Sequence, residues 1–268
     1  MILGLFSALA SAALFGVAAV VQASAIRAVA DDDLGLRGFV HAALRSWPML
    51  GVVAAYLAGF VLHAVALVLL PLYLAQASIS LSLPVTAVVS AVVLHERLGP
   101  TRCLAVVAVI AGLVLVAAGA GSVEQTTSTA TLTALGAGWL LVLVAGTRPS
   151  LARGAGILGA WSGLGYAGSA VTTRGLSADE PLLSLLALAL VSALGLVAFW
   201  LYSVALRRTD VAASTGPLIV VQTCVPALIG VAAFGDTTRP GWELAVVVGL
   251  VVSIVGAVRL GRDTPATV

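Results

Sequence analysis

The stretch PMLGVVAAYLAGFVLHAVALVLLPLYLAQASISLSLPVTAVVSAVVL, residues 48–94, contains no Asp, Glu, Lys or Arg and is divided by Pro71. A helix needs roughly 20 predominantly apolar residues to cross the hydrocarbon core of a bilayer. The stretch therefore predicts two membrane-spanning helices, residues 48–69 and 72–94, with a tight turn at Pro71 between them.

The rest of the chain has the same character. Of its 268 residues, 61% are hydrophobic and 9% are charged, and the mean hydropathy is +1.16. A soluble domain is about 45–50% apolar and about 25% charged, and a disordered chain is more polar still. Continuous apolar runs also argue against a transmembrane β-barrel, whose strands alternate apolar and polar residues. The composition predicts an all-α, polytopic helical membrane protein.

Windows free of Asp, Glu, Lys and Arg set the number of predicted spans at nine. They are residues 2–26, 48–69, 72–94, 103–120, 131–147, 154–173, 181–206, 211–233 and 244–258. Between the first two spans, Arg37, His41 and Arg45 recur every four residues. This spacing predicts a short amphipathic helix on the membrane surface at about residues 34–47, with Asp33 as its N-cap.

The arginines predict the orientation of these spans. All 13 basic residues are Arg, and 11 of them lie in the odd-numbered connections or at the C-terminus, against Arg174 and Arg239 on the other side. The positive-inside rule then places the N-terminus outside and the C-terminus in the cytoplasm, in the plasma (inner) membrane. A net charge of +2 without a basic domain argues against a nucleic-acid partner.

An internal repeat is visible at an offset of 140 residues. It aligns Pro100 with Pro240, each followed closely by Leu-Ala-Val-Val, and Glu96 with Asp236. The predicted topology puts the two copies in opposite orientations, so spans 1–4 and 6–9 are predicted to be inverted repeats. The expected organisation is a first membrane repeat (1–120), a linker with the fifth span (121–153) and a second, inverted membrane repeat (154–268). Inverted repeats are typical of secondary transporters, which bind their cargo near the midplane between the repeats.

Three stretches resemble the drug/metabolite transporter superfamily, in particular its EamA-like and nine-helix, NIPA-like members of actinobacterial type. They are ALFGVAAVVQASAI (13–26), GFVLHAVALVLLPLYLAQA (59–77) and LSLPVTAVVSAVVLHERLGP (81–100). The resemblance extends over nearly the whole chain, although its motifs are apolar and weakly specific. It implies a transporter fold with inverted repeats, and small metabolites or, for the NIPA-like branch, Mg²⁺ as cargo.

Polar residues at helical spacing predict where the cargo binds. Ser78, Ser82, Thr86 and Ser90 share one face of the third span. On the eighth span, Asp210, Ser214 and Gln222 share a face, and Pro84, Pro217 and Pro226 are expected to interrupt the two helices. We expect His63, Gln76, Ser82, Thr86, Ser214 and Gln222 to bind the substrate. The alternative is that the hydroxyl groups only pack helices and bond to carbonyls of their own helix.

His63 is the one ionisable side chain well inside a predicted span. A titratable group at that depth suggests a function, and the reference pKa of histidine, about 6.5, suits proton coupling. In that case His63→Ala should flatten the dependence of transport on pH. The alternative is a neutral imidazole that is hydrogen-bonded between helices. Gln22, Gln76 and Gln222 are also deep, and each requires polar partners within the bundle.

The function predicted from the sequence is that of a secondary transporter, which moves a small solute by alternating access. A NIPA-like Mg²⁺ transporter is the alternative in the same class, although no Asp or Glu lies in mid-span and no metal site is predicted. A membrane-embedded accessory or lipid-handling subunit is the alternative of another class. We expect no enzyme activity and no cofactor. The expected partners are a small-molecule or ion substrate and the lipid bilayer, and a homodimer stays open.

One motif suggests a different chemistry. Gly163, Gly165 and Gly168 match G-x-G-x-x-G, but a dinucleotide site needs a preceding strand. The motif lies within the predicted span 154–173, on a face of small residues. The sequence favours a helix-packing surface there instead.

Overall fold

The computed structural model describes residues 2–27, 36–94, 99–119, 121, 127–151, 153–209 and 211–262. These residues form eleven α-helices: α1 (Ile2–Arg27), α2 (Leu36–Arg45), α3 (Trp47–Leu69), α4 (Leu72–Ile79), α5 (Ser82–Val93), α6 (Pro100–Ala118), α7 (Thr129–Leu151), α8 (Ala155–Thr173), α9 (Pro181–Arg208), α10 (Val211–Ala233) and α11 (Glu243–Arg262). The all-α prediction is confirmed. The charge-free windows coincide with helices, apart from 72–94, which contains two.

Five of the helices are long and apolar enough to cross a membrane: Ile2–Ile26, Trp47–Leu69, Thr129–Arg148, Pro181–Arg208 and Ala213–Ala233. The distribution of side chains is the reverse of that in a soluble protein. Leu104, Leu141 and Leu182 are exposed on the surface, whereas Gln22 and Gln76 are buried in the interior. An apolar exterior around polar contacts is what a lipid environment stabilises. The chain is a multi-pass membrane protein.

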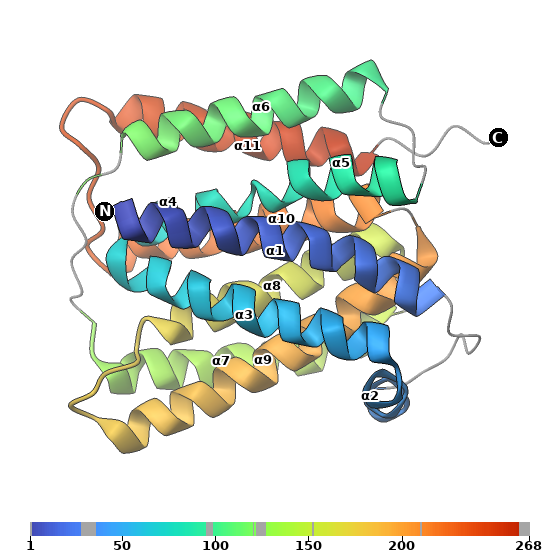
Figure 1. Cartoon of the computed structure of the whole chain (residues 1–268). Coiled ribbons are helices and arrows are strands. Elements are labelled where there is room, and N and C mark those ends of the chain that lie inside the picture. Colours follow the sequence, from blue (N-terminus) through green and yellow to red (C-terminus); the bar gives the residue numbers. More distant parts are fainter. Residues whose placement is uncertain are drawn as a thin grey trace.

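The long helices lie side by side with their axes along a common direction (Figure 1). α6 packs against α11 at one edge of the bundle, and α7 packs against α8 and α9 at the opposite edge. Between these edges, α1 contacts α3 and α5, and α10 contacts α4 and α8. Segments far apart in the sequence therefore meet in the middle of the bundle.

Close packing of α6 on α11 depends on glycine. A Cβ at Gly249 would lie 2.6 Å from the carbonyl oxygen of Gly112, and one at Gly112 would meet the carbonyl of Gly249 and lie 2.8 Å from the nitrogen of Ser253. A turn or two away, a Cβ at Gly256 would lie 2.8 Å from the carbonyl oxygen of Ala105. Small residues let the two backbones approach this closely, which maximises van der Waals contact where lipid supplies no hydrophobic drive.

The predicted surface helix is α2, which Figure 1 shows almost end-on, crosswise to the long helices. Phe39 on its inner face is buried and contacts the ring of Phe199 on α9, at 5.7 Å between centroids. Arg37, His41 and Arg45 are exposed, as the four-residue spacing predicts. The predicted N-cap, Asp33, lies outside the described residues.

The predicted single helix 72–94 is wrong in one respect, because the chain is broken between α4 and α5 at Ser80 and Leu81. Pro84 is the cause, since it has no N–H to donate to the carbonyl of Ser80 four residues earlier. The backbone tightens instead, and Leu83 N–H donates to the Ser80 carbonyl at 3.1 Å. α3 ends in a similar way, because Leu70 before Pro71 is extended (φ −126°, ψ 153°).

The expectation of an interrupted eighth span is also wrong. α10 runs without a break from Val211 to Ala233 through both Pro217 and Pro226. Neighbouring helices stabilise such a segment, because α4, α8 and α11 all pack against it.

Candidate functional site

A buried polar cluster lies where α3, α4 and α10 meet. Nε2 of His63 on α3 lies 3.2 Å from Nε2 of Gln76 on α4. One turn further along the chain, the hydroxyls of Ser80 and Thr223 are hydrogen-bonded at 2.9 Å. The Thr223 hydroxyl also donates to the Gln76 carbonyl at 3.4 Å. We call these four residues the central cluster. Pro71 and the break at Ser80 isolate α4 as a short helix, and that helix presents Gln76 to His63.

Within the central cluster, His63 retains unused hydrogen-bonding capacity. Its Nδ1 is one of two buried side-chain polar atoms without a hydrogen-bond partner among the described residues; the other is the Tyr166 hydroxyl. When the Gln76 amide nitrogen donates to Nε2, the neutral ring carries its proton on Nδ1. The cluster can therefore offer a donor to the acceptor atom of a small solute.

The central cluster is closed in this conformation. His63 and Gln76 are 4% and 1% exposed. The cavity beside Ser80 and Thr223, bordered by Ser253 of α11, has a volume of about 10 Å³. That is close to the smallest space that holds one water molecule. A solute can reach the cluster only if helices move apart.

A second polar cluster joins α1, α3 and α9. The Tyr56 hydroxyl donates to Oε1 of Gln22 at 2.9 Å, and Nε2 of Gln22 donates to the Ser203 hydroxyl at 2.6 Å. Next to Ser203, the hydroxyls of Tyr202 on α9 and Thr215 on α10 lie 2.6 Å apart. The sequence predicts that Gln22 needs polar partners, and the structure provides them from α3 and α9.

Tyr56→Phe tests the strength of this second cluster. The substitution keeps the ring that stacks on Phe15 at 5.6 Å but removes the donor to Gln22. We expect the free energy of unfolding to fall by about 0.5–1.5 kcal/mol, the usual contribution of one hydrogen bond. Chemical unfolding in detergent micelles would measure it. In a double-mutant cycle with Gln22→Leu, a coupling energy near zero would contradict the prediction.

The structure brings together only part of the predicted binding set. His63 and Gln76 are in contact, and Gln222 is buried beside Thr223 of the central cluster. Thr86 instead faces α1, where its hydroxyl donates to the Gly16 carbonyl at 3.2 Å. The backbone of Ser82 lies against the same glycine.

The remaining predicted hydroxyls also lie at packing contacts. Ser214 is fully buried, with its carbonyl against Gly159 of α8. Ser78 and Ser90 donate to carbonyls of their own helices, those of Leu74 and Ala87. The four hydroxyls of the third span do not share one helix, because the break at Ser80 divides them. Asp210 lies outside the described residues.

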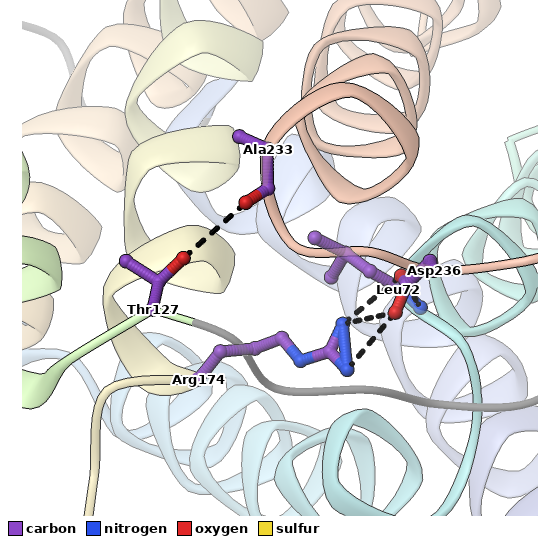
Figure 2. Close-up of polar contacts among 5 residues, drawn as sticks. All are labelled: Leu72, Thr127, Arg174, Ala233 and Asp236. Atoms are coloured by element: carbon purple, nitrogen blue, oxygen red, sulfur yellow. Dashed lines mark hydrogen bonds and ion pairs between the residues drawn. The ribbon is translucent and has the colours of Figure 1, made fainter.

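An ion pair is buried at the end of the bundle where α8 and α10 finish (Figure 2). Nη1 of Arg174, directly after α8, lies 3.0 and 3.1 Å from the two carboxylate oxygens of Asp236, which follows α10. Oδ2 of Asp236 also accepts the N–H of Leu72, the first residue of α4, at 2.7 Å. The guanidinium lies over the ring of Phe234, 5.9 Å from its centroid.

The electrostatics of Asp236 reflect two opposing influences. Burial raises the pKa of its carboxyl group, whereas the charge of Arg174 and the Leu72 N–H lower it. The two side chains are 3% and 0% exposed. We call Arg174, Asp236 and the Leu72 N–H the terminal ion-pair cluster.

Sequence reasoning missed this cluster. Arg174 serves there only as one of two arginines on the outer side, and Asp236 only as the repeat partner of Glu96. Tyr56, Tyr202, Ser203 and Thr215 are missed as well. The one available signal is that Arg174 and Asp236 are opposite charges at the ends of predicted spans on the same side of the membrane.

The chain matches no protein-family model. No curated protein and no solved structure matches it either. Among the described residues, no three His, Cys, Asp or Glu side chains are grouped so that they could hold a metal ion. The G-x-G-x-x-G motif lies in helix α8, where a Cβ on Gly163 would lie 3.1 Å from the Leu218 backbone. The packing interpretation of this motif is confirmed.

Proposed function

We propose that this protein is a secondary carrier, which moves a small solute across the plasma membrane by alternating access. It crosses the membrane nine times, with the N-terminus outside and the C-terminus in the cytoplasm. Spans 1–4 and 6–9 form inverted repeats, as in the drug/metabolite transporters that the sequence resembles. The observation that carries the proposal is a set of interhelical hydrogen bonds that recur at corresponding positions of the two halves.

These hydrogen bonds follow one offset. His63 contacts Gln76, and 139 residues further along the chain Tyr202 contacts Thr215; each pair is separated by 13 residues. The hydroxyls of Ser11 and Ser162 donate to the carbonyls of Gly59 and Ala198, at 2.7 and 2.8 Å, and these two acceptors are also 139 residues apart. The first residues of α4 and α10 differ by the same number. This is one less than the offset of 140 that aligns the prolines in the sequence.

Helix packing supports the same arrangement. A two-fold axis that exchanges the halves brings the third span of one repeat against the third of the other, and the fourth against the fourth. α4 packs on α10, and α6 packs on α11 with a near-reciprocal contact of Gly112 and Gly249. The central cluster lies at the α4–α10 interface, where carriers built from inverted repeats bind their cargo.

The residues of the cluster favour a small, uncharged solute with hydrogen-bonding groups. His63, Gln76, Ser80 and Thr223 offer neutral donors and acceptors, and Asp236 is already paired with Arg174. His63 is also the group through which we propose proton coupling. Its replacement by Ala should remove the pH dependence of flux near the histidine range.

A test of alternating access needs no knowledge of the cargo. Cys103 and Cys224 are replaced by Ser, and Thr223→Cys is introduced as a reporter in the central cluster. In oriented vesicles, we expect a membrane-impermeant thiol reagent to label the reporter from either side. Labelling from one side only, or from neither, would contradict a carrier and favour an accessory or lipid-handling subunit.

Mg²⁺ flux distinguishes the cation alternative. Purified protein in liposomes with an entrapped Mg²⁺ dye should give no entry above empty liposomes if the cargo is uncharged. Protein-dependent entry, together with labelling from both sides, would replace the neutral solute with Mg²⁺ as the cargo.

A further inference from the structure

The terminal ion-pair cluster joins three segments that are remote in sequence. Arg174 belongs to the end of α8, Asp236 to the α10–α11 connection and Leu72 to the start of α4. In the proposed repeats, α8 and α10 belong to the second half and α4 to the first. The cluster therefore fastens one half to the other at the outer end of the bundle, as Figure 2 shows for Arg174, Asp236 and Leu72.

The backbone around Asp236 is shaped for this contact. Gly235, with φ 75°, turns the chain at the end of α10, and the N–H of Asp236 donates back to the Gly230 carbonyl at 3.1 Å. A Cβ at Gly230 would lie 2.7 Å from Oδ2 of Asp236 and 3.0 Å from Cβ of Leu72. The carboxylate thus occupies space that only a glycine leaves free. Beside it, the Thr127 hydroxyl donates to the Ala233 carbonyl at 3.3 Å.

The helix held by the carboxylate is the one that carries Gln76 to His63. α4 has eight residues and is separated from its neighbours by Pro71 on one side and by the break at Ser80 and Leu81 on the other. Leu72 and Gln76 are one helical turn apart. A movement of the start of α4 is therefore transmitted to the His63–Gln76 contact, while α3 and α5 can stay in place.

We propose that Arg174 and Asp236 form a latch, which holds the outer end of the carrier closed and keeps α4 against α10. Opening toward the outside requires Asp236 to release the Leu72 N–H and the guanidinium. Hydration of the two freed charges offsets the loss of the pair, so the closed and open arrangements can be close in free energy. This inference rests on the proposed carrier function and identifies what controls outer access to its central cluster.

The Thr223→Cys reporter tests the latch when combined with Asp236→Asn. Asn keeps an oxygen that can accept the Leu72 N–H but loses the charge that holds Arg174. We expect labelling from the outer side to become about tenfold faster and labelling from the inner side to become slower, the change produced by a bias of about 1.4 kcal/mol between two states. Arg239→Gln is the matched control, since Arg239 is an exposed arginine at the same end. It should leave both rates unchanged.

Hydrogen exchange separates a released latch from a general loss of structure. In Asp236→Asn, amides of α4 should exchange faster while those of α6 and α11 keep their protection. Uniformly faster exchange, or unchanged outer labelling in folded protein, would overturn the latch. The two proposals fail differently: reporter labelling from both sides with no effect of Asp236→Asn leaves the carrier and removes the latch. If the reporter with native Asp236 is not labelled from both sides, the carrier itself is wrong, and with it the latch as a control of transport.

Discussion

Arg174→Ala should lower the free energy of unfolding by about 3–5 kcal/mol. The Asp236 side chain is 0% exposed, so removal of the guanidinium leaves a buried carboxylate with the Leu72 N–H as its remaining partner in the cluster. Breaking a buried pair from one side leaves an uncompensated charge, which is why the effect exceeds that of a typical surface substitution. Denaturant titration in detergent micelles, followed by far-UV circular dichroism, would measure the loss.

Two controls isolate the ion pair as the cause. Arg239→Ala removes an arginine of the same end that is exposed and lies over the ring of Trp242. It should change stability by no more than about 0.5 kcal/mol. The double variant Arg174→Ala/Asp236→Ala should be more stable than Arg174→Ala, because no buried charge remains. Equal stabilities of the single and double variants would show that the carboxylate is not the source of the loss.

Gly112→Ala is expected to have the second largest effect. Alanine has the higher intrinsic helix propensity, by up to about 1 kcal/mol, so the substitution would stabilise an isolated helix. In the folded protein, the new methyl group meets the Gly249 carbonyl and lies 2.8 Å from the Ser253 nitrogen. Because both are backbone atoms, α6 and α11 must separate, and we expect a net loss of about 1–3 kcal/mol in the free energy of unfolding.

Gly195→Ala provides the matched control for this contact. Gly195 lies within α9 and has nothing within 4 Å of the position that a Cβ would take. Here the propensity effect should act alone, so that the variant is as stable as the parent or more stable. A Gly112→Ala variant that behaves like Gly195→Ala would mean that the α6–α11 contact is looser than described.

Charge and hydropathy were sufficient to locate the helices. A charged side chain in hydrocarbon is costly, so the charge-free windows had to coincide with the apolar segments. The break between α4 and α5 was harder to place. Pro84 announces it in the sequence, but the same residue type in α10, at Pro217 and Pro226, leaves the helix intact. Whether a proline interrupts a membrane helix depends on which neighbours satisfy the freed backbone groups.

For the candidate site, the sequence indicated that deep polar residues need partners but not which partners. His63 and Gln76 are both expected from the sequence, and they do meet. Thr86 has the same helical spacing as its neighbours, yet it packs against Gly16 of α1. Hydroxyl groups can bond to another helix, to their own helix or to a solute, and only the rotation of each helix against its neighbours decides which.

The sequence by itself determined that this chain is a helical membrane protein, where its apolar segments lie and which of its polar residues are deep. These properties follow from composition and local periodicity, because the bilayer acts on every residue alike. Only the tertiary structure decided that Arg174 reaches Asp236 across 62 residues, that Gln22 joins Tyr56 to Ser203, and that Gly112 meets Gly249. Such contacts depend on how helices from opposite ends of the chain pack, and packing is selected by shape and hydrogen bonding between partners rather than by any local pattern.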